Sequence, residues 1–307
     1  MEKYILGITT YNRKRRLKKL IESLKATYES NFNWKIIVAD DGSSDGTLEY
    51  LKGINIPDMP IIIIRNNRQG IHHQFNTIIN ELMKLEFNYC FKCDDDVEFI
   101  QPGWEKLYVD AINEYGYHHL CHFDSDWQPG KNLKNPIRKG KLVSYCSAKD
   151  VQGAFFTLTP DIIKRVGYMD TKNFGFRGVG HIDYTTRACR AGYNNINHPF
   201  DVSGSNKYIK HQSGEYKSAL NIHIQNALES DDNSRRKYKL IEEPSRIYIP
   251  YAESFQYLNQ QTEKDLLVKR IEDLEDQLTW YKKNYDHQPK WFVRLGKILD
   301  RLNIFKH

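Results

Sequence analysis

Three consecutive carboxylates, Asp94, Asp95 and Asp96, follow one short apolar run and lead directly into another. Aspartate is rare in strands whereas the flanking aromatic and branched residues favour them, so we expect the triplet at the end of a buried strand. Carboxylates this close repel one another unless a cation is present. Hard oxygen ligands suit Mg²⁺ or Mn²⁺, and Mg²⁺ is usually held by one or two carboxylates together with substrate phosphates. The pattern predicts a divalent-cation site, with a solvated acidic turn as the alternative.

The composition is that of a soluble globular protein. The chain has 307 residues, of which 40% are hydrophobic and 27% charged, and its net charge is +6. This length suits one large domain, or a domain with appendages. The odd number of cysteines, five, and the lack of a signal peptide predict a cytoplasmic protein without a disulfide framework. We expect Cys90 and Cys93, which form a CxxC without a second pair, to be buried strand thiols.

Apolar runs alternate with amphipathic stretches through the first part of the chain. The runs at 4–8, 34–39 and 61–64, and the one before Asp94, have the length and composition of buried strands. The stretches between them show helical spacing of their apolar residues. Strands and helices that alternate with short connections predict a mostly parallel sheet covered on both faces.

Polar clusters follow each expected strand, at 9–12, 40–44, 66–70 and 94–96. Ligands of such sheets bind at the carboxyl ends of the strands. Each cluster alone would be an ordinary turn, but all four should meet at one edge of the sheet. Their coincidence predicts a nucleotide site.

The segments TTYNR, VADDGSSDGT, NNRQG and DDD occur here in the order and spacing found in family 2 glycosyltransferases of the GT-A fold, which the chain resembles over about residues 3–215. The DDD segment matches the DxD motif of that fold, with Asp94 and Asp96 as its two acids. The resemblance implies a nucleotide-sugar donor, a divalent cation, Mn²⁺ or Mg²⁺, and inversion at the anomeric carbon.

The resemblance also implies roles for single residues. Thr9, Tyr11 and Asp41 would hold the nucleoside, Asp94 would lie near the ribose, and Asp96 would bind the metal. Arg68 either adds positive charge beside the diphosphate leaving group or is a surface arginine. We count Asp94 as a second metal ligand and assign four further residues to the donor site: Arg13, Arg68, Gly70 and Asp95.

Residues 174–193 resemble the Gly-rich loop and helix start that supply the catalytic base in this family. The spacing from Asp183 to Arg187 places His181 where the usual base aspartate stands, and a shift of register offers Asp183 instead. An acceptor hydroxyl must lose a proton as it attacks, and a base of near-neutral pKa such as histidine suits that step. Both residues therefore remain candidates.

Several GT-A enzymes supply a third metal ligand from the region after 200, and His211 matches by position, with His198 as the competitor. The stretch 151–158 reads as a strand, in which Gly153 would let an acceptor sugar approach the backbone closely. The close histidines at 118, 119 and 122 lack the spacing of a zinc site and are expected in a strand or loop.

Beyond the catalytic domain at 1–215, we expect an extension at 216–258, an oligomerisation helix at 259–285 and a basic amphipathic helix at 288–307. Apolar residues at 267, 271, 274, 278 and 281 follow coiled-coil spacing and predict a homo-oligomer, unless that helix packs on its own domain. The last segment suits the surface of an anionic membrane, with an oligomer or core contact as the alternative.

The sequence thus predicts an α/β protein of GT-A fold with a C-terminal helical extension. We expect it to move a sugar, from a UDP-linked donor in the first instance, to a hydroxyl of a glycan or lipid-linked acceptor in surface polysaccharide synthesis. It would be cytoplasmic, with peripheral binding to the inner face of the cell membrane. The basic stretch 13–19 is read as a solvated helix face, so no nucleic-acid partner is expected. The alternatives are an inactive GT-A-like scaffold and a nucleotidyltransferase, although TTYNRKRR lacks the glycines that grip a triphosphate.

Overall fold

The computed structural model describes residues 2–28, 32–124, 126, 135–176, 178–212 and 231–251. The expected coiled coil, the basic terminal helix and the parts of the extension at 216–230 and 252–258 lie outside these residues. One compact unit is formed by 1–214 together with 239–255, so the chain returns to this unit within the stretch assigned above to a separate extension. No helix in the described ranges is long and apolar enough to cross a bilayer.

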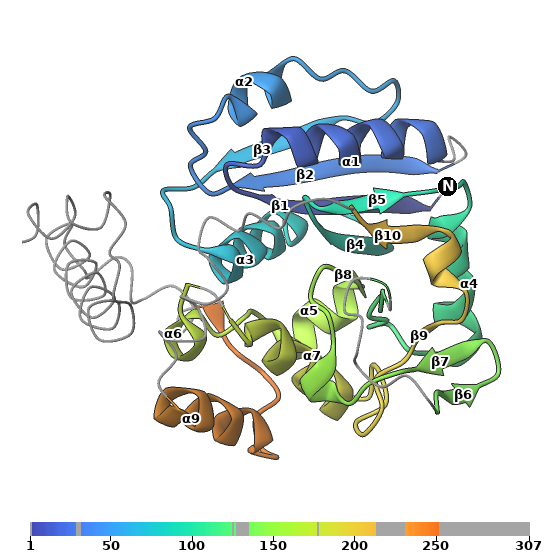
Figure 1. Cartoon of the computed structure of the whole chain (residues 1–307), viewed down its shortest axis with the longest axis vertical. Helices are drawn as coiled ribbons and strands as arrows, with labels where there is room; N and C mark the ends of the chain where they lie inside the picture. The colour runs from blue at the N-terminus through green and yellow to red at the C-terminus, as the bar shows by residue number, and fades with distance from the viewer. Residues whose placement is uncertain are drawn as a thin grey trace, which may run out of the picture. The chain divides into compact units, whose positions relative to one another are not determined.

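A five-stranded sheet in the order β3-β2-β1-β4-β8 organises this unit (Figure 1). The first four strands in the chain run parallel and β8 pairs antiparallel with β4. The predicted mostly parallel sheet is therefore confirmed, but β8 is shorter than the strand expected at 151–158. The strands are β1 (Lys3–Thr10), β2 (Asn33–Asp40), β3 (Ile61–Arg65), β4 (Tyr89–Asp94) and β8 (Phe155–Leu158).

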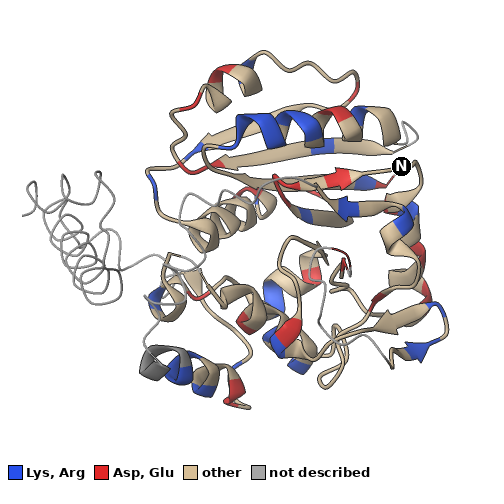
Figure 2. Cartoon of the chain, in the orientation of Figure 1, with Lys and Arg blue, Asp and Glu red and all other residues tan. Residues whose placement is uncertain are grey.

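Helices α1 (Lys14–Thr27) and α4 (Trp104–Tyr115) cover one face of the sheet. The buried face of α1 is formed by four apolar residues at helical spacing, which pack into the core: Leu17, Leu20, Ile21 and Leu24. Figure 2 shows Lys and Arg along this helix, and 14, 15, 18, 19 and 25 are exposed. The basic stretch is thus a solvated helix face, the reading preferred from the sequence.

Helices α3 (Ile71–Leu82), α5 (Pro160–Val166) and α7 (Gly180–Arg190) supply the apolar layer on the opposite face (Figure 1). Phe75 of α3 meets Tyr184 of α7 with ring centres 5.0 Å apart. Cys90 belongs to this layer, whereas Cys93 belongs to the core under α1. Side chains three apart on a strand point to opposite faces, so the two thiols of the CxxC cannot pair. Both are free and buried.

Smaller elements complete the unit. β5 (Val97–Phe99) pairs antiparallel with β10 (Ile209–His211), which sets His211 opposite Val97, directly after the acidic triplet. A three-stranded sheet is formed by β6, β7 and β9. The remaining elements of the unit are α2 (Thr47–Lys52), β6 (Ile137–Lys139), β7 (Leu142–Ser144), η1 (Ala148–Asp150), α6 (Thr171–Phe174), β9 (Asp201–Val202) and η2 (Ser205–Lys207). The last described helix is α9 (Asp231–Glu242), of which only the part from residue 239 belongs to this unit.

His119 gives this core a pH dependence that can be measured. Its ring is fully buried between the Thr157 carbonyl at 3.2 Å and the Thr185 hydroxyl at 3.0 Å. Burial lowers the pKa of His119 to about 4. The unfolded chain would take up this proton near pH 6.5, so this residue's stabilising contribution is present above that pH and is lost as the pH falls toward 4. Each unit of pKa difference corresponds to about 1.4 kcal/mol.

We therefore expect the His119 ring to remain neutral through pH 5 in an NMR titration of ¹⁵N-labelled histidines. A titration midpoint near pH 6.5 in the folded protein would contradict its placement. The chain unfolded in urea serves as the reference, because an unperturbed histidine titrates near pH 6.5.

Candidate active site

The polar residues that follow the parallel strands do meet at one edge of the sheet. Thr9 and Asp94 stand opposite each other in the β1–β4 register, and the Thr9 hydroxyl donates to the Asp94 carboxylate at 2.7 Å. The Thr10 hydroxyl donates to Asp95 at 2.8 Å. The backbone N–H of Asp41 donates to the Thr10 carbonyl at 3.0 Å and so joins the end of β2 to the end of β1.

The cations that the acidic triplet needs are partly supplied by the chain itself. The Arg13 guanidinium lies 3.0 Å from an Asp95 oxygen and 3.1 Å from an Asp96 oxygen. The ammonium of Lys92, for which the sequence pattern predicted no role, contacts Asp94. Mutual repulsion among the carboxylates is thereby reduced in this arrangement.

Asp95 faces inward. It is 2% exposed, and its two oxygens accept from Thr10 and Arg13. Burial raises the pKa of Asp95 to about 7, with Arg13 acting against that rise and Asp96 adding to it. These contacts fit an internal role better than the donor contact expected from the sequence.

Asp41 anchors the loop that follows β3. Its buried carboxylate accepts from the Arg68 guanidinium at 2.7 Å and from the backbone N–H groups of Gln69 at 2.7 Å and Gly70 at 2.9 Å. Gly70 has a φ of +90°, and a Cβ there would lie 2.1 Å from the Phe176 carbonyl oxygen. Only glycine fits such a position without displacing its neighbour. The expected donor-site residues Asp41, Arg68 and Gly70 thus form one unit.

Arg68 is stacked between two aromatic rings, so it is not an ordinary surface arginine. The guanidinium carbon lies 3.5 Å from the ring centre of Tyr11 and 4.3 Å from that of Phe176. The same guanidinium is bound to the Asp41 carboxylate, so the ring contacts and the ion pair together fix its place. Phe176 was not identified from the sequence, because it lies in an irregular glycine-rich segment far along the chain.

His211 adjoins the triplet through the backbone, since the N–H of Gln212 donates to the Asp96 carbonyl at 2.7 Å. The His211 ring Nδ1 lies 3.3 Å from Asp124, which also accepts from the His211 backbone N–H at 2.7 Å. Burial would raise the pKa of Asp124, but the hydrogen bonds and charge of His211 hold it well below its usual range. His198 is exposed.

The side chains near the acidic triplet are of the types that bind a divalent metal ion. Asp94 and Asp96 offer carboxylate oxygens and His211 an imidazole, all acceptable to Mn²⁺. A carboxylate on the Nδ1 side of the ring, here Asp124, is the usual partner of a metal-binding histidine. Within the described residues, however, no three His, Cys, Asp or Glu side chains are already assembled around one point. Arg13 holds Asp96, and a metal ion would have to displace that ion pair.

His181 lies at the start of α7, beside the β4 end of the site. Its Nε2 is 3.1 Å from the Val151 carbonyl oxygen. A Cβ on Gly153 would lie 2.7 Å from the His181 ring, so this glycine makes room for the imidazole, in the place where we had expected an acceptor sugar. Burial, followed by the charges of His72 and Lys92, lowers the pKa of His181 to about 4. The near-neutral pKa expected from the residue type is not what these surroundings produce.

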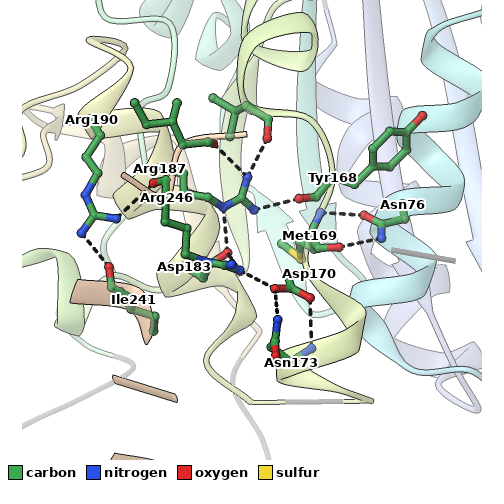
Figure 3. A network of polar contacts seen from close by, with 12 residues as sticks. Asn76, Tyr168, Met169, Asp170, Asn173, Asp183, Arg187, Arg190, Ile241 and Arg246 are labelled. Carbon is green, nitrogen blue, oxygen red and sulfur yellow. Dashed lines mark hydrogen bonds and ion pairs between the residues drawn. The ribbon is translucent and has the colours of Figure 1, made fainter. Parts of the chain in front are cut away.

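Asp183 belongs to a buried ion network (Figure 3). Its carboxylate accepts from Arg187 at 2.8 Å and from Arg246 at 2.7 Å. Arg187 also donates to the carbonyls of Val166 at 2.6 Å and Tyr168 at 2.8 Å. Burial opposes ionisation, but the two guanidiniums lower the pKa of Asp183 below its usual value. A fully buried carboxylate with both oxygens engaged is poorly suited to the general-base role that the sequence left open for it.

The fold is that of a GT-A glycosyltransferase. The sequence model of glycosyl transferase family 2 matches residues 6–167, more than half of the chain, and the chain belongs to that family. The predicted family, fold and enzyme class are thereby confirmed.

Two kinds of relative agree with this assignment. An uncharacterized glycosyltransferase of Acanthamoeba polyphaga mimivirus is 26% identical over 213 residues, which are 67% of this chain and 79% of that protein. A mannosyltransferase from Pyrobaculum calidifontis, solved in complex with GDP-Man and Mn²⁺, has a TM-score of 0.55 at 12% identity and covers 99% of this chain and 81% of its own. S. aureus TarS has a TM-score of 0.50 at 15% identity over 96% of this chain and 50% of its own. At these identities the solved structures are informative about the fold alone.

Proposed function

We propose that this glycosyltransferase is metal-dependent and inverting, and that it transfers a sugar from a nucleotide-sugar to a hydroxyl group. The observation that carries the proposal is the meeting of three sets of residues at one edge of the sheet. The Tyr11, Arg68 and Asp41 set suits a nucleoside, and the acidic triplet with His211 suits a cation. His181 lies across from them on α7.

The divalent ion, Mn²⁺ or Mg²⁺, would be held by Asp96 and His211, with Asp94 beside them. When bound, it supplies charge that stabilises the diphosphate as it leaves. Arg13, which the ion would displace from Asp96, would stay at the same edge through its ion pair with Asp95 and would add positive charge there. Asp41 accepts hydrogen bonds, so it can take an N–H of a base or a ribose hydroxyl in place of Arg68.

His181 is the base that this arrangement favours. A backbone carbonyl can only accept a hydrogen bond, so the contact with Val151 places the proton on Nε2 and leaves Nδ1 as the basic nitrogen. With a pKa of about 4 the ring is neutral at physiological pH and able to accept the proton of an attacking hydroxyl. Its low pKa makes it a weaker base than an unperturbed histidine.

A panel of UDP- and GDP-linked sugars, with and without Mn²⁺, tests this proposal on the full-length protein. We expect one donor to raise the melting temperature only when Mn²⁺ is present, and the same donor to be hydrolysed slowly to free nucleotide. The anomeric configuration of the transferred sugar, read by NMR, should be inverted. Donor binding without any turnover would favour the inactive scaffold, and release of pyrophosphate from a triphosphate would favour the nucleotidyltransferase.

The acceptor is proposed to be a glycan or a lipid-linked sugar of a surface polysaccharide. This rests on the basic amphipathic pattern at 288–307, which lies outside the described residues. We expect deletion of 288–307 to release the protein from liposomes containing anionic lipid, and neutral liposomes provide the control. Equal binding of the shortened and full-length chains would remove the support for a membrane-bound acceptor.

The homo-oligomer expected from the 267–281 pattern and the cytoplasmic location are likewise proposals from the sequence.

A further inference from the structure

Lys92 is a charged residue buried in the middle of β4, a central strand of the sheet. Lys92 stands between Gly7 of β1 and Phe156 of β8, and only 3% of its side chain is exposed. Alternation along β4 places it on the same face as Asp94, toward α3 and α7. A buried ammonium is costly unless it is paired, and an apolar side chain would fill this layer at a lower cost. The charge at this position therefore needs an explanation other than packing.

The Lys92 ammonium joins two parts of the site. It donates to the Asp94 carboxylate and, at 2.7 Å, to the backbone carbonyl of Gly153. The nitrogen also lies 5.4 Å from the centre of the Phe156 ring, which contributes a weaker attraction. Lys92 thus links the end of β4, where the donor is proposed to bind, to the segment 151–153 that precedes β8.

His181 is positioned by that same segment. Its Nε2 contacts the Val151 carbonyl, and its ring packs where Gly153 has no side chain. The charged or titratable groups that act on His181 are Lys92 and Asp94 from β4 and His72 from α3. The segment 151–154 itself carries no titratable side chain. Lys92 is therefore the connection between the acidic triplet and the proposed base.

We propose that Lys92 is a positioning residue that holds Asp94 and the segment 151–153 in one arrangement, so that the bound donor and the imidazole of His181 face each other correctly. This rests on the proposed function of the site. In the described structure Lys92 reaches the donor site only through Asp94 and forms no hydrogen bond or ion pair with Tyr11, Asp41 or Arg68, so its effect should fall more on the chemical step than on nucleotide binding. Misplacing a reacting group by about 1 Å can cost about 100-fold in rate.

The test compares Lys92→Met, which removes the charge and the donors, with Lys92→Gln, which keeps a donor without the charge. We expect kcat to fall about 100-fold in Lys92→Met and about 10-fold in Lys92→Gln, while the Kd for UDP with Mn²⁺ changes less than about threefold. In ¹⁵N-histidine NMR titrations of both variants, the pKa of His181 should rise because the nearby cation is gone. Lys106→Met, at an exposed lysine of α4, is the matched control and should change none of these quantities.

The NMR readout does not require turnover, so it separates this proposal from the proposed function. If wild type shows no transfer with any donor but the His181 shift appears, the link between Lys92 and His181 stands and the function fails. Unchanged kcat and unchanged His181 titration in Lys92→Met would overturn the positioning role. Equal losses in kcat and UDP affinity would also overturn it, since Lys92 would then act in donor binding. Failure of both variants to fold would make Lys92 a purely structural residue and overturn it as well.

Discussion

Replacing Asp183 by asparagine is expected to lower the free energy of unfolding by about 3–5 kcal/mol, because it leaves the buried Arg187 guanidinium without its anion and Arg246 with Asp170 as its remaining acidic partner. Arg187 is fully buried, and Arg246 reaches Asp183 from the returning segment near the C-terminal end of the described chain. The network in Figure 3 therefore joins α7 to residues far away in the sequence. Urea unfolding followed by circular dichroism measures the change.

Asp110→Asn is the control for this measurement, since Asp110 forms an exposed ion pair with Lys106 one helical turn away. Such pairs contribute about 0.5 kcal/mol or less. If Asp183→Asn kept wild-type stability and lost only activity, the network would not have the structural role described here. Asp183 would then return as the general base in place of His181.

Replacing Asp96 by alanine is expected to reduce kcat/KM for the preferred donor by about 1,000-fold, equivalent to about 4 kcal/mol of transition-state stabilisation. Asp96 is the acid of the triplet that stands closest in the chain to the β5–β10 pair, where His211 lies. The thermal shift produced by donor with Mn²⁺ should be lost together with the activity. Asp95 would still pair with Arg13, so the variant is expected to fold.

The same two measurements on Asp110→Ala provide the comparison, because that carboxylate lies on the outer side of α4 and should affect neither. Retention of Mn²⁺-dependent stabilisation in Asp96→Ala would remove Asp96 from the metal site. Activity that is equal with and without chelator in wild type would contradict metal dependence altogether.

Much of the fold and part of the site follow from local pattern. The repeating apolar runs and amphipathic stretches predict the parallel strands and their covering helices, because burial on a pleated sheet or one helix face requires that spacing. The convergence of Thr9 with Asp94, and of both with the end of β2, follows from the rule that parallel strands end at one edge. The family resemblance is carried by these same segments.

Other features were decided by contacts between residues distant in the sequence. Residue type alone suggested a near-neutral pKa for His181, but burial against the 151–153 segment and the charge of Lys92 lower it. Asp124 and Phe176 join the site from segments without periodicity, the first through His211 and the second through Arg68.

The sequence by itself determined which strands form, which polar ends they carry and which family they represent, because these depend on side-chain spacing along the chain. Only the tertiary structure decided which positively charged side chains pair with which carboxylates. Arg13 and Lys92 balance the acidic triplet, and Arg187 with Arg246 engages Asp183. The physical reason is that electrostatic and desolvation energies depend on distance and burial in space, which spacing along the chain does not specify.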